Sequence, residues 1–281
     1  MLYLKKFENH SSYTAQQASL ITPNVSYCND VNDVHYKQKI PDNSVLFICE
    51  NIQPNTTETV NIYYDNSTHP YDLGFSVDKN NKLYKYICTQ GFNRIRSTNN
   101  IISTVILNKI DKINSTGYYW FPTNVESVSI KDCVILDGCQ LNSMCSGCTN
   151  LVKFEATNLN TSKVTNMDNA FTNCSNLTSL DLSGFKGTSN ITNMQNLFSG
   201  CQNLKEINMS GWNLAPYEQT NSNGMFGNVN EVNSLVGING IKFIMKNAGP
   251  YTKSTIETII SNFNRDLSTA GRPNITYSIE E

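Results

Sequence analysis

Four cysteines in one stretch are the first residues of this sequence whose type and spacing could do chemistry. They form the pattern Cys133-x5-Cys139-x5-Cys145-x2-Cys148. Thiolates bind zinc, but a zinc knuckle usually has two close pairs of ligands, and this pattern contains one. A free cysteine also behaves as a small buried hydrophobe. We therefore expect these cysteines to pack, with no metal and no cofactor, and we keep a zinc site and a disulfide as the alternatives.

Enzymatic chemistry has little support elsewhere in the chain. A cysteine nucleophile needs a histidine base, and the three histidines, His10, His35 and His69, lie far from the cysteine-rich stretch. Asp65, His69 and Asp72 are close in sequence, but NSTHPYD is turn-like and reads as a solvated loop. A glycosidase needs two carboxylates facing one cleft, and such a pair could form in space without a sequence signature. We expect no catalytic residues and no enzyme.

The composition describes a polar surface that carries few charges. The 281 residues have a formal net charge of -2 and 16% charged residues, against about 25% in an average protein. No basic field is present for nucleic acid or anionic lipid. No segment approaches the roughly twenty apolar residues of a membrane span, and MLYLKKFENHSSY lacks a signal-peptide run. Nine cysteines are an odd number for a disulfide framework, so we expect reduced thiols.

A repeated segment supplies the frame for these residues. NMDNAFTNCSNLTSLDLSG, residues 166–184, is followed by NMQNLFSGCQNLKEINMSG, residues 193–211. An apolar triplet recurs at nearly even steps, with its first member at positions 125, 151, 177, 204 and 232. Its copies are Val125/Val128/Ile130, Leu151/Phe154/Ala156, Leu177/Leu180/Leu182, Leu204/Ile207/Met209 and a decayed Val232/Leu235. A second mark recurs upstream of each triplet at Cys145, Phe171, Phe198 and Phe226.

A period in the twenties with such a triplet is typical of a leucine-rich solenoid. Within the triplet, alternate residues face one side of a short strand. Between triplets, apolar residues at spacings of 3, 4 and 3 predict a short helix: Val164, Met167, Phe171 and Cys174. The predicted repeat core is Leu151, Phe154, Phe171, Cys174, Leu177, Leu180, Leu182, Phe198, Cys201, Leu204 and Ile207. Cys148, Cys174 and Cys201 share one register, which Asn228 continues, and this register favours packing.

The strings VTNMDNAFTNCSNLTSLDLSGF (164–185) and ITNMQNLFSGCQNLKEINMSGW (191–212) resemble the BspA-like leucine-rich repeat family. That family is known from surface proteins of bacteria and parasites and from phage virion proteins. The resemblance covers about residues 118–245 and implies a binding or structural scaffold, rarely an enzyme. The insertion at 217–224 and the Asn228 at the cysteine register depart from the pattern, as a terminal repeat would.

The remaining segments predict an α+β chain of four parts. Residues 40–117 contain SVLFICE, TVNIYYD, KLYKYIC and NIISTVILNKI, which predict a small β-sandwich or barrel. Residues 118–245 hold the repeats, each a strand plus a short helix. Residues 246–281 form a helix-strand cap, whose helix covers 251–267 with Thr252 or Ser254 as N-cap. Residues 1–39 form an anchoring arm.

The arm is rich in aromatic residues and too small to build its own core. The string YLKKFENHSSYTAQQASLITPNVSYCNDVNDVHY resembles the N-terminal segment of virion structural proteins of crAss-like and related phages of gut Bacteroidales. That resemblance implies attachment to the particle. Our candidate docking residues are Tyr3, Leu4, Phe7, Tyr13, Leu20, Pro23, Val25, Tyr27, Val34 and Tyr36. The alternative is an ordinary strand and helix of the β-domain.

These expectations combine into a non-enzymatic phage virion protein, assembled in the host cytoplasm and located in the virion. We expect a head fibre or capsid decoration protein, anchored by its N-terminus to the major capsid or another virion protein. Its repeats would adhere to a host-surface or mucosal glycan or protein. We expect a homo-oligomer, with a trimer favoured, and neither nucleic acid nor a membrane span. The alternatives are a tail fibre or receptor-binding protein and a bacterial surface adhesin.

Overall fold

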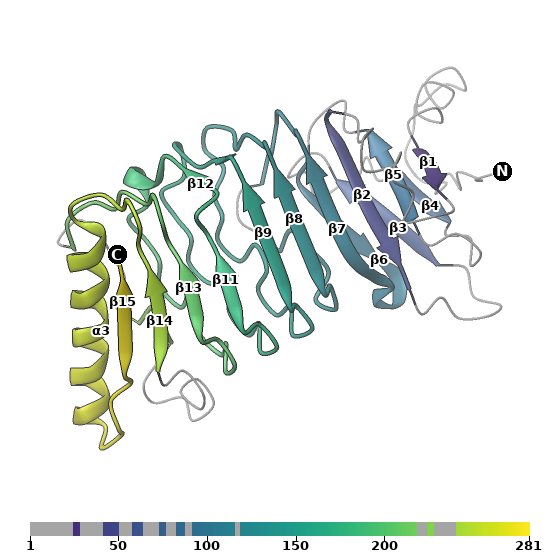
Figure 1. Ribbon diagram of the computed structural model, residues 1–281. Coiled ribbons are helices and arrows are strands. Elements are labelled where there is room, and N and C mark those ends of the chain that lie inside the picture. Colours follow the sequence, from purple (N-terminus) through teal and green to yellow (C-terminus); the bar gives the residue numbers. More distant parts are fainter. Residues whose placement is uncertain are drawn as a thin grey trace.

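A single sheet runs along most of the described chain and forms one wall of a solenoid (Figure 1). The computed structural model describes residues 25–28, 42–50, 58–63, 73–76, 83–87, 92–115, 119–217, 224–227 and 240–281. Within these residues the protein is mostly β, with one long helix at the C-terminal end of the solenoid.

The ten strands of this sheet change from antiparallel to parallel at β7. The antiparallel end consists of β1 (Val25–Cys28), β5 (Leu83–Ile87), β2 (Ser44–Cys49) and β7 (Ile102–Asn108). The parallel part continues through β8 (Ser127–Lys131), β9 (Lys153–Thr157), β11 (Ser179–Asp181), β13 (Glu206–Asn208), β14 (Ile241–Ile244) and β15 (Tyr277–Glu280). Because β7 pairs with β2 on one side and with β8 on the other, the sheet is continuous across residue 117.

The pairing register of the parallel strands reproduces the period of the sequence repeat from β8 to β13. We call each strand of this parallel part, with its place in the sheet, a rung. Ser127 lies opposite Lys153, which is the same step along the chain as the one from triplet position 125 to position 151. Ser179 lies opposite Glu206, which matches the step from position 177 to position 204. The triplets therefore predicted the strands β8, β9, β11 and β13 correctly.

The next rung does not follow the triplets. Glu206 of β13 pairs with Lys242 of β14, much further along the chain than one repeat period, so the segment IKFI forms this strand. The strand beside β13 is therefore β14, and the decayed fifth triplet at Val232/Leu235 is not tested. Val232 and Leu235 themselves lie outside the described residues.

The short helix predicted for each repeat is also wrong: the segments between strands are successive turns. Two positions in each turn segment have a left-handed backbone, which an α-helix of L-residues does not accept. One position is occupied by Ser143, Asn169 and Asn196, and the other by Gly147, Asn173 and Gly200. Asn and Gly tolerate this conformation best. The Asn residues at these positions are thus explained by turns that recur once per coil.

Backbone hydrogen bonds join each turn segment to the next coil. The N–H of Phe171 donates to the carbonyl of Leu197 at 3.1 Å, and the N–H of Phe198 donates to the carbonyl of Met225 at 2.9 Å. These bonds repeat at the Cys145/Phe171/Phe198/Phe226 mark of the sequence. Each coil is therefore tied to its neighbours on the turn side as well as through the sheet.

Smaller elements complete the fold. A second antiparallel sheet has the order β4 (Leu73–Ser76), β3 (Thr59–Tyr63) and β6 (Arg94–Ser97), and it lies behind β2 and β5 in Figure 1. A parallel pair consists of β10 (Leu159–Asn160) and β12 (Phe185–Lys186), and two 3-10 turns are η2 (Thr98–Asn100) and η3 (Thr188–Asn190). The four strands predicted in residues 40–117 are present as β2, β3, β5 and β7, whereas β4 and β6 were not predicted.

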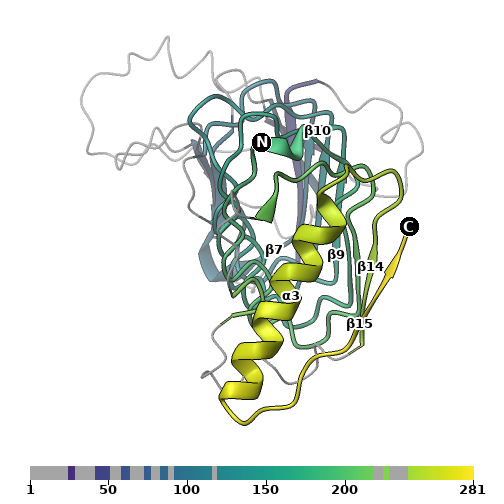
Figure 2. The same ribbon diagram turned by 90° about the vertical axis from the view of Figure 1, so that its left-hand side faces the viewer.

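The helix α3 (Thr252–Thr269) crosses the open end of the last coil (Figure 2). Its buried apolar face contains the five predicted residues, Ile256, Ile259, Ile260, Phe263 and Leu267. The predicted N-caps are wrong, because Tyr251 occupies that position without a side-chain cap. The Thr252 hydroxyl instead donates to the carbonyl of Trp212 at 3.0 Å and accepts from the N–H of Leu214 at 3.0 Å. It thereby joins the start of the helix to the coil beneath it.

A row of aromatic rings runs through the core from coil to coil. Neighbouring ring centroids are 5.0 to 6.4 Å apart along the row Phe154, Phe171, Phe198, Phe226 and Phe263. All five rings are buried. Aromatic pairs at such separations contribute about 0.5–1.5 kcal/mol each beyond burial. The last member, Phe263, belongs to α3, so the row connects the cap to the repeats.

Candidate binding surface

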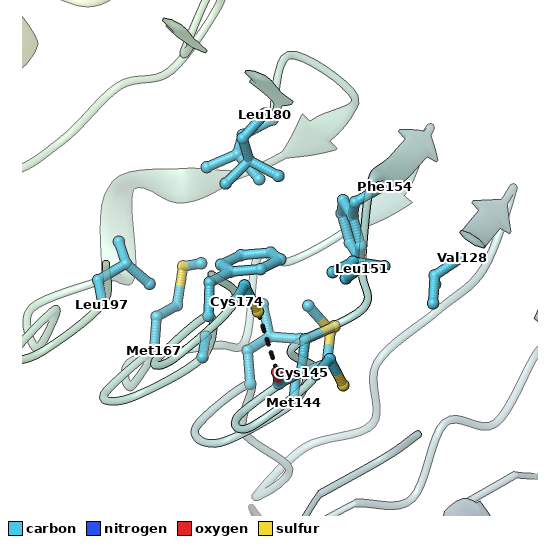
Figure 3. Close-up of a cluster of buried hydrophobic side chains, with 14 of the residues drawn as sticks. Val128, Met144, Cys145, Leu151, Phe154, Met167, Cys174, Leu180 and Leu197 are labelled. Atoms are coloured by element: carbon cyan, nitrogen blue, oxygen red, sulfur yellow. Dashed lines mark hydrogen bonds between the residues drawn. The ribbon is translucent and has the colours of Figure 1, made fainter. Parts of the chain in front are cut away.

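The predicted repeat-core residues face the interior. All eleven are buried, and none has more than 3% of its surface exposed: Leu151, Phe154, Phe171, Cys174, Leu177, Leu180, Leu182, Phe198, Cys201, Leu204 and Ile207. Figure 3 shows several of them between the sheet and the turn segments. They hold the coil together, so a binding surface must be sought among the residues that alternate with them.

Three of the cysteines form a hydrogen-bonded series in the same core. The thiol of Cys174 donates to the carbonyl of Cys145 at 3.2 Å, the bond drawn in Figure 3. The thiol of Cys201 donates to the carbonyl of Phe171 at 3.0 Å, and that of Cys148 to the carbonyl of Pro122 at 3.5 Å. Each thiol thus contacts the preceding coil. A small side chain with a weak donor fits this position well.

The environment of three of the cysteines is opposite to that of a reactive thiol. Burial raises the pKa of Cys49 to about 12 and the pKa of Cys133 to about 11. Burial and the neighbouring Cys148 thiol raise the pKa of Cys145 well above its usual value. A nucleophilic cysteine needs a lowered pKa, because the thiolate is the reactive form. These three thiols stay protonated and inert at neutral pH.

The described cysteines also do not gather around one point. Cys49, Cys133, Cys139, Cys145, Cys148, Cys174 and Cys201 are all free and buried. Cys133 donates to the carbonyl of Lys131 at 3.2 Å, whereas Cys139 contacts the side-chain oxygen of Asn114 at 3.5 Å. Among the described residues, no group of three or more His, Cys, Asp or Glu side chains could hold a metal ion. The cysteine pattern therefore gives no candidate site in this part of the chain.

The outward face of the parallel sheet is the surface that the repeats present to solvent. Its side chains form two rows across the strands. One row is Thr104, Ser127, Lys153, Ser179, Glu206, Lys242 and Ser278, and the other is Ile106, Ser129, Glu155, Asp181, Asn208, Ile244 and Glu280. All fourteen are exposed or half-buried. We call these residues the outer sheet face; they change type from rung to rung, while the buried positions between them stay apolar.

Charges near the middle of the outer sheet face are arranged in a defined pattern. Glu155 and Asp181 lie directly opposite each other on neighbouring strands. Two like charges in this relation are destabilising unless they are compensated. Lys153 forms an ion pair with Glu155 at 2.9 Å, and a carboxylate oxygen of Asp181 accepts from the N–H of Ser183 at 2.9 Å. These two contacts offset the repulsion, and both carboxylates remain at the surface.

A second charged group lies at the C-terminal end of the same face. The ammonium group of Lys242 is 2.5 Å from Glu280 and 3.8 Å from Glu206, so it bridges three strands. Lys246 lies 2.8 Å from the other oxygen of Glu280. Hydrogen bonds from Lys242 and then Lys246 lower the pKa of Glu280 to about 2. This carboxylate is ionised at any pH near neutrality.

The predicted docking residues of the arm are not brought into a described site. Val25 and Tyr27 lie on β1, which pairs with β5. The other eight candidates, Tyr3, Leu4, Phe7, Tyr13, Leu20, Pro23, Val34 and Tyr36, lie outside the described residues, as do His10, His35 and His69.

Comparisons with known proteins identify one similarity. Residues 137–248 match the model of a family described as Mycoplasma protein of unknown function, DUF285. No curated protein and no solved structure matches the chain. Among the described residues, no helix, α3 included, is both long enough and apolar enough to cross a membrane. Over its repeat region, which is leucine-rich-repeat-like and less than half of the chain, this protein is therefore similar to the DUF285 family.

Proposed function

We propose that this protein is a non-enzymatic adhesion scaffold that presents the outer sheet face to another macromolecule. The observation that carries the proposal is the contrast between the two sides of each strand. Val128, Phe154, Leu180 and Ile207 are buried and apolar, whereas the outward residues between them differ in charge and size from rung to rung. A solenoid that keeps its frame and varies its outward side chains is the architecture of an extended binding surface.

The rigidity of this surface supports the same proposal. The ion pair of Lys153 with Glu155 and the bridge from Glu206 through Lys242 to Glu280 hold side chains in fixed positions. Exposed ion pairs contribute little to folding stability, typically about 0–1 kcal/mol. Their arrangement is better suited to recognition, because complementary charge patterns determine which partner associates.

For the setting, we propose a phage virion, with residues 1–39 as the anchor and a head fibre or capsid decoration as the form of attachment. The support is the resemblance of the N-terminal sequence to phage virion proteins. A trimer would display three copies of the outer sheet face. A bacterial surface adhesin is the second candidate, and the specific observation in its favour is that the matching family is described by Mycoplasma proteins.

The adhesion proposal is tested by exchanging charges within an ion pair. In the double variant Lys153→Glu/Glu155→Lys the pair is retained but its direction on the outer sheet face is reversed. We expect thermal stability to change little and binding of the full-length protein to mucin-coated surfaces to fall. The matched control is Lys253→Glu/Glu281→Lys, which reverses a pair at α3, away from this face. Equal binding by wild type and both variants would refute a role for the outer sheet face.

The virion setting needs a separate experiment. Gold-labelled antibody against the repeats, viewed by electron microscopy, should decorate phage heads in lysates of the producing culture. Deletion of residues 1–24, which ends before β1, should leave a folded protein that no longer enters particles. If the antibody labels the bacterial envelope and leaves the phage particles unlabelled, the adhesin is favoured instead. Labelled tails would favour a tail fibre.

A further inference from the structure

Two arginines lie side by side on the outward face of the second sheet. On β6, Ile95 points into the core, so Arg94 and Arg96 both lie on the opposite face. In the pairing of β6 with β3, Arg94 is opposite Tyr63 and Arg96 is opposite Asn61. Residues directly opposite on antiparallel strands share a face. This places two guanidinium groups beside a tyrosine ring and an amide.

The contacts of both arginines are known in the described chain. The guanidinium carbon of Arg94 lies 4.1 Å from the centre of the Tyr63 ring, and its Nη1 donates to the side-chain oxygen of Asn93 at 3.2 Å. Arg96 donates from Nη1 to the carbonyl of Ile95 at 2.7 Å and from Nη2 to the carbonyl of Tyr119. A guanidinium has five N–H donors. Several donors on each arginine therefore remain for a ligand.

Neither arginine is neutralised within the described chain. Among the described residues, no carboxylate lies within 4 Å of either guanidinium, although ion pairs occur at several lysines and at Arg265. Burial and then the charge of Arg94 lower the pKa of Arg96 to about 10. The group is still charged at neutral pH. Two half-buried like charges without a counter-ion are unfavourable, and an anion from outside would relieve the repulsion.

The residues next to the two arginines indicate which kind of anion would bind there. Tyr119 is exposed by 46%, which is high for a large aromatic residue, and its carbonyl is held by Arg96. An exposed tyrosine offers an apolar ring and a hydroxyl at the same point. A sugar ring has an apolar side that can stack on a tyrosine ring and hydroxyl groups that form hydrogen bonds beside it. A simple inorganic anion has no such apolar side.

We infer that Arg94, Arg96, Tyr63 and Tyr119 form a binding site for an acidic saccharide, a sugar that carries a carboxylate. The planar guanidinium matches the two oxygens of a carboxylate and forms paired hydrogen bonds with it. The apolar side of the sugar ring stacks on Tyr119. This site lies on the second sheet and is separate from the outer sheet face, so it does not depend on the function proposed above.

The test is calorimetric titration of the full-length protein with a galacturonic acid tetramer at low salt. We expect binding that weakens as salt rises, and no comparable binding of the neutral galactose tetramer. Arg94→Gln should weaken the affinity roughly tenfold or more, the usual effect of losing a hydrogen bond to a charged group. Arg94→Lys keeps the charge but loses the planar guanidinium, so its affinity should lie between those of the wild type and Arg94→Gln.

The control variant is Arg265→Gln, an exposed arginine on α3 that is 3.5 Å from Asp266. It changes the net charge by the same amount and should leave the affinity unchanged. Far-UV circular dichroism and thermal unfolding show whether Arg94→Gln is folded. If it is not, Arg94→Lys replaces it as the variant whose affinity is compared with that of the wild type. The inference is overturned if the neutral tetramer binds equally, if neither Arg94 variant weakens binding, or if no binding occurs at millimolar tetramer. Displacement by inorganic phosphate at equal concentration would show a general anion site and would overturn it as well.

Discussion

The Ser-Gly pair that ends each of the two clearest repeats allows a sharp test of how the coils pack. Gly184 and Gly211 occupy the same place in consecutive repeats, but the structure gives them different roles. A Cβ atom on Gly184 would lie 1.7 Å from the carbonyl oxygen of Ala156 and 2.4 Å from its carbonyl carbon. A Cβ atom on Gly211 would meet no atom within 4 Å, but Gly211 has a φ of +75°.

The expected costs follow from these geometries. Gly211→Ala forces an L-residue into the left-handed region, which costs roughly 1–2 kcal/mol, and the stiffer unfolded chain returns about 0.4–1 kcal/mol. Gly184→Ala places a methyl group on backbone atoms of the preceding coil, and overpacking costs about 1–3 kcal/mol or more. The coils must separate there, which also endangers the 2.9 Å bond from the N–H of Leu159 to the carbonyl of Gly184, worth about 0.5–1.5 kcal/mol. We expect about 1 kcal/mol for Gly211→Ala and about 3 kcal/mol or more for Gly184→Ala.

Urea unfolding followed by far-UV circular dichroism measures both values. The midpoint should shift much further for Gly184→Ala than for Gly211→Ala, with similar slopes if both variants unfold in one step. Equal shifts would refute the close approach of Gly184 to Ala156. A larger shift for Gly211→Ala would show that backbone conformation, rather than contact between coils, determines why this position is glycine.

Three further predictions concern the core, the thiols and the outer sheet face. Phe171→Ala removes the ring between Phe154 and Phe198 and should lower the free energy of unfolding by about 3–5 kcal/mol in urea titrations, whereas the exposed Thr178→Ala should stay within about 0.5 kcal/mol. Because Cys174 is buried and a hydrogen bond with Cys201 and burial raise its pKa, this thiol should react with a disulfide reagent only after denaturation; mass spectrometry of labelled Cys174 in native protein would contradict this. The depressed pKa of Glu280 means that its stabilising effect is present above its ordinary pKa of 4.5 and is lost as pH falls toward 2. The melting temperatures of wild type and Glu280→Gln should therefore differ at pH 7 and converge at low pH, and a gap that widened in acid would contradict the assignment.

The strands of the repeats could be predicted from the sequence because burial alternates along them. Leu180 and Leu182 face the core on either side of the exposed Asp181, and only a strand gives this period. The turn segments could not be predicted in the same way. Val164, Met167 and Phe171 have helical spacing, yet they face the core from a chain of turns that the left-handed Asn169 keeps out of a helix.

Some of the site residues could likewise be predicted from the sequence and others could not. The repeat register showed that Cys174 and its equivalents face inward, because the same position recurs in a frame of buried residues. Arg94 and Arg96 were missed, since the sequence RIRS shows only that two arginines flank an apolar residue. Their importance depends on Tyr63, which belongs to the distant strand β3 and pairs with β6 only in the folded chain, and on the lack of a described carboxylate nearby. A long-range strand pairing of this kind has no local sequence signal.

The continuous parallel sheet has a consequence for how such a protein can change its length. Each coil contacts mainly the coils beside it. Because neighbouring strands are about 4.8 Å apart, duplication of one repeat unit would add one coil and extend the molecule by that distance. It would also add one position to each of the two rows, and neither the antiparallel start at β2 and β7 nor the closing helix α3 would need to change. The reach of the molecule can thus increase or decrease in whole coils, and each new coil brings its own pair of outward residues for selection to act on.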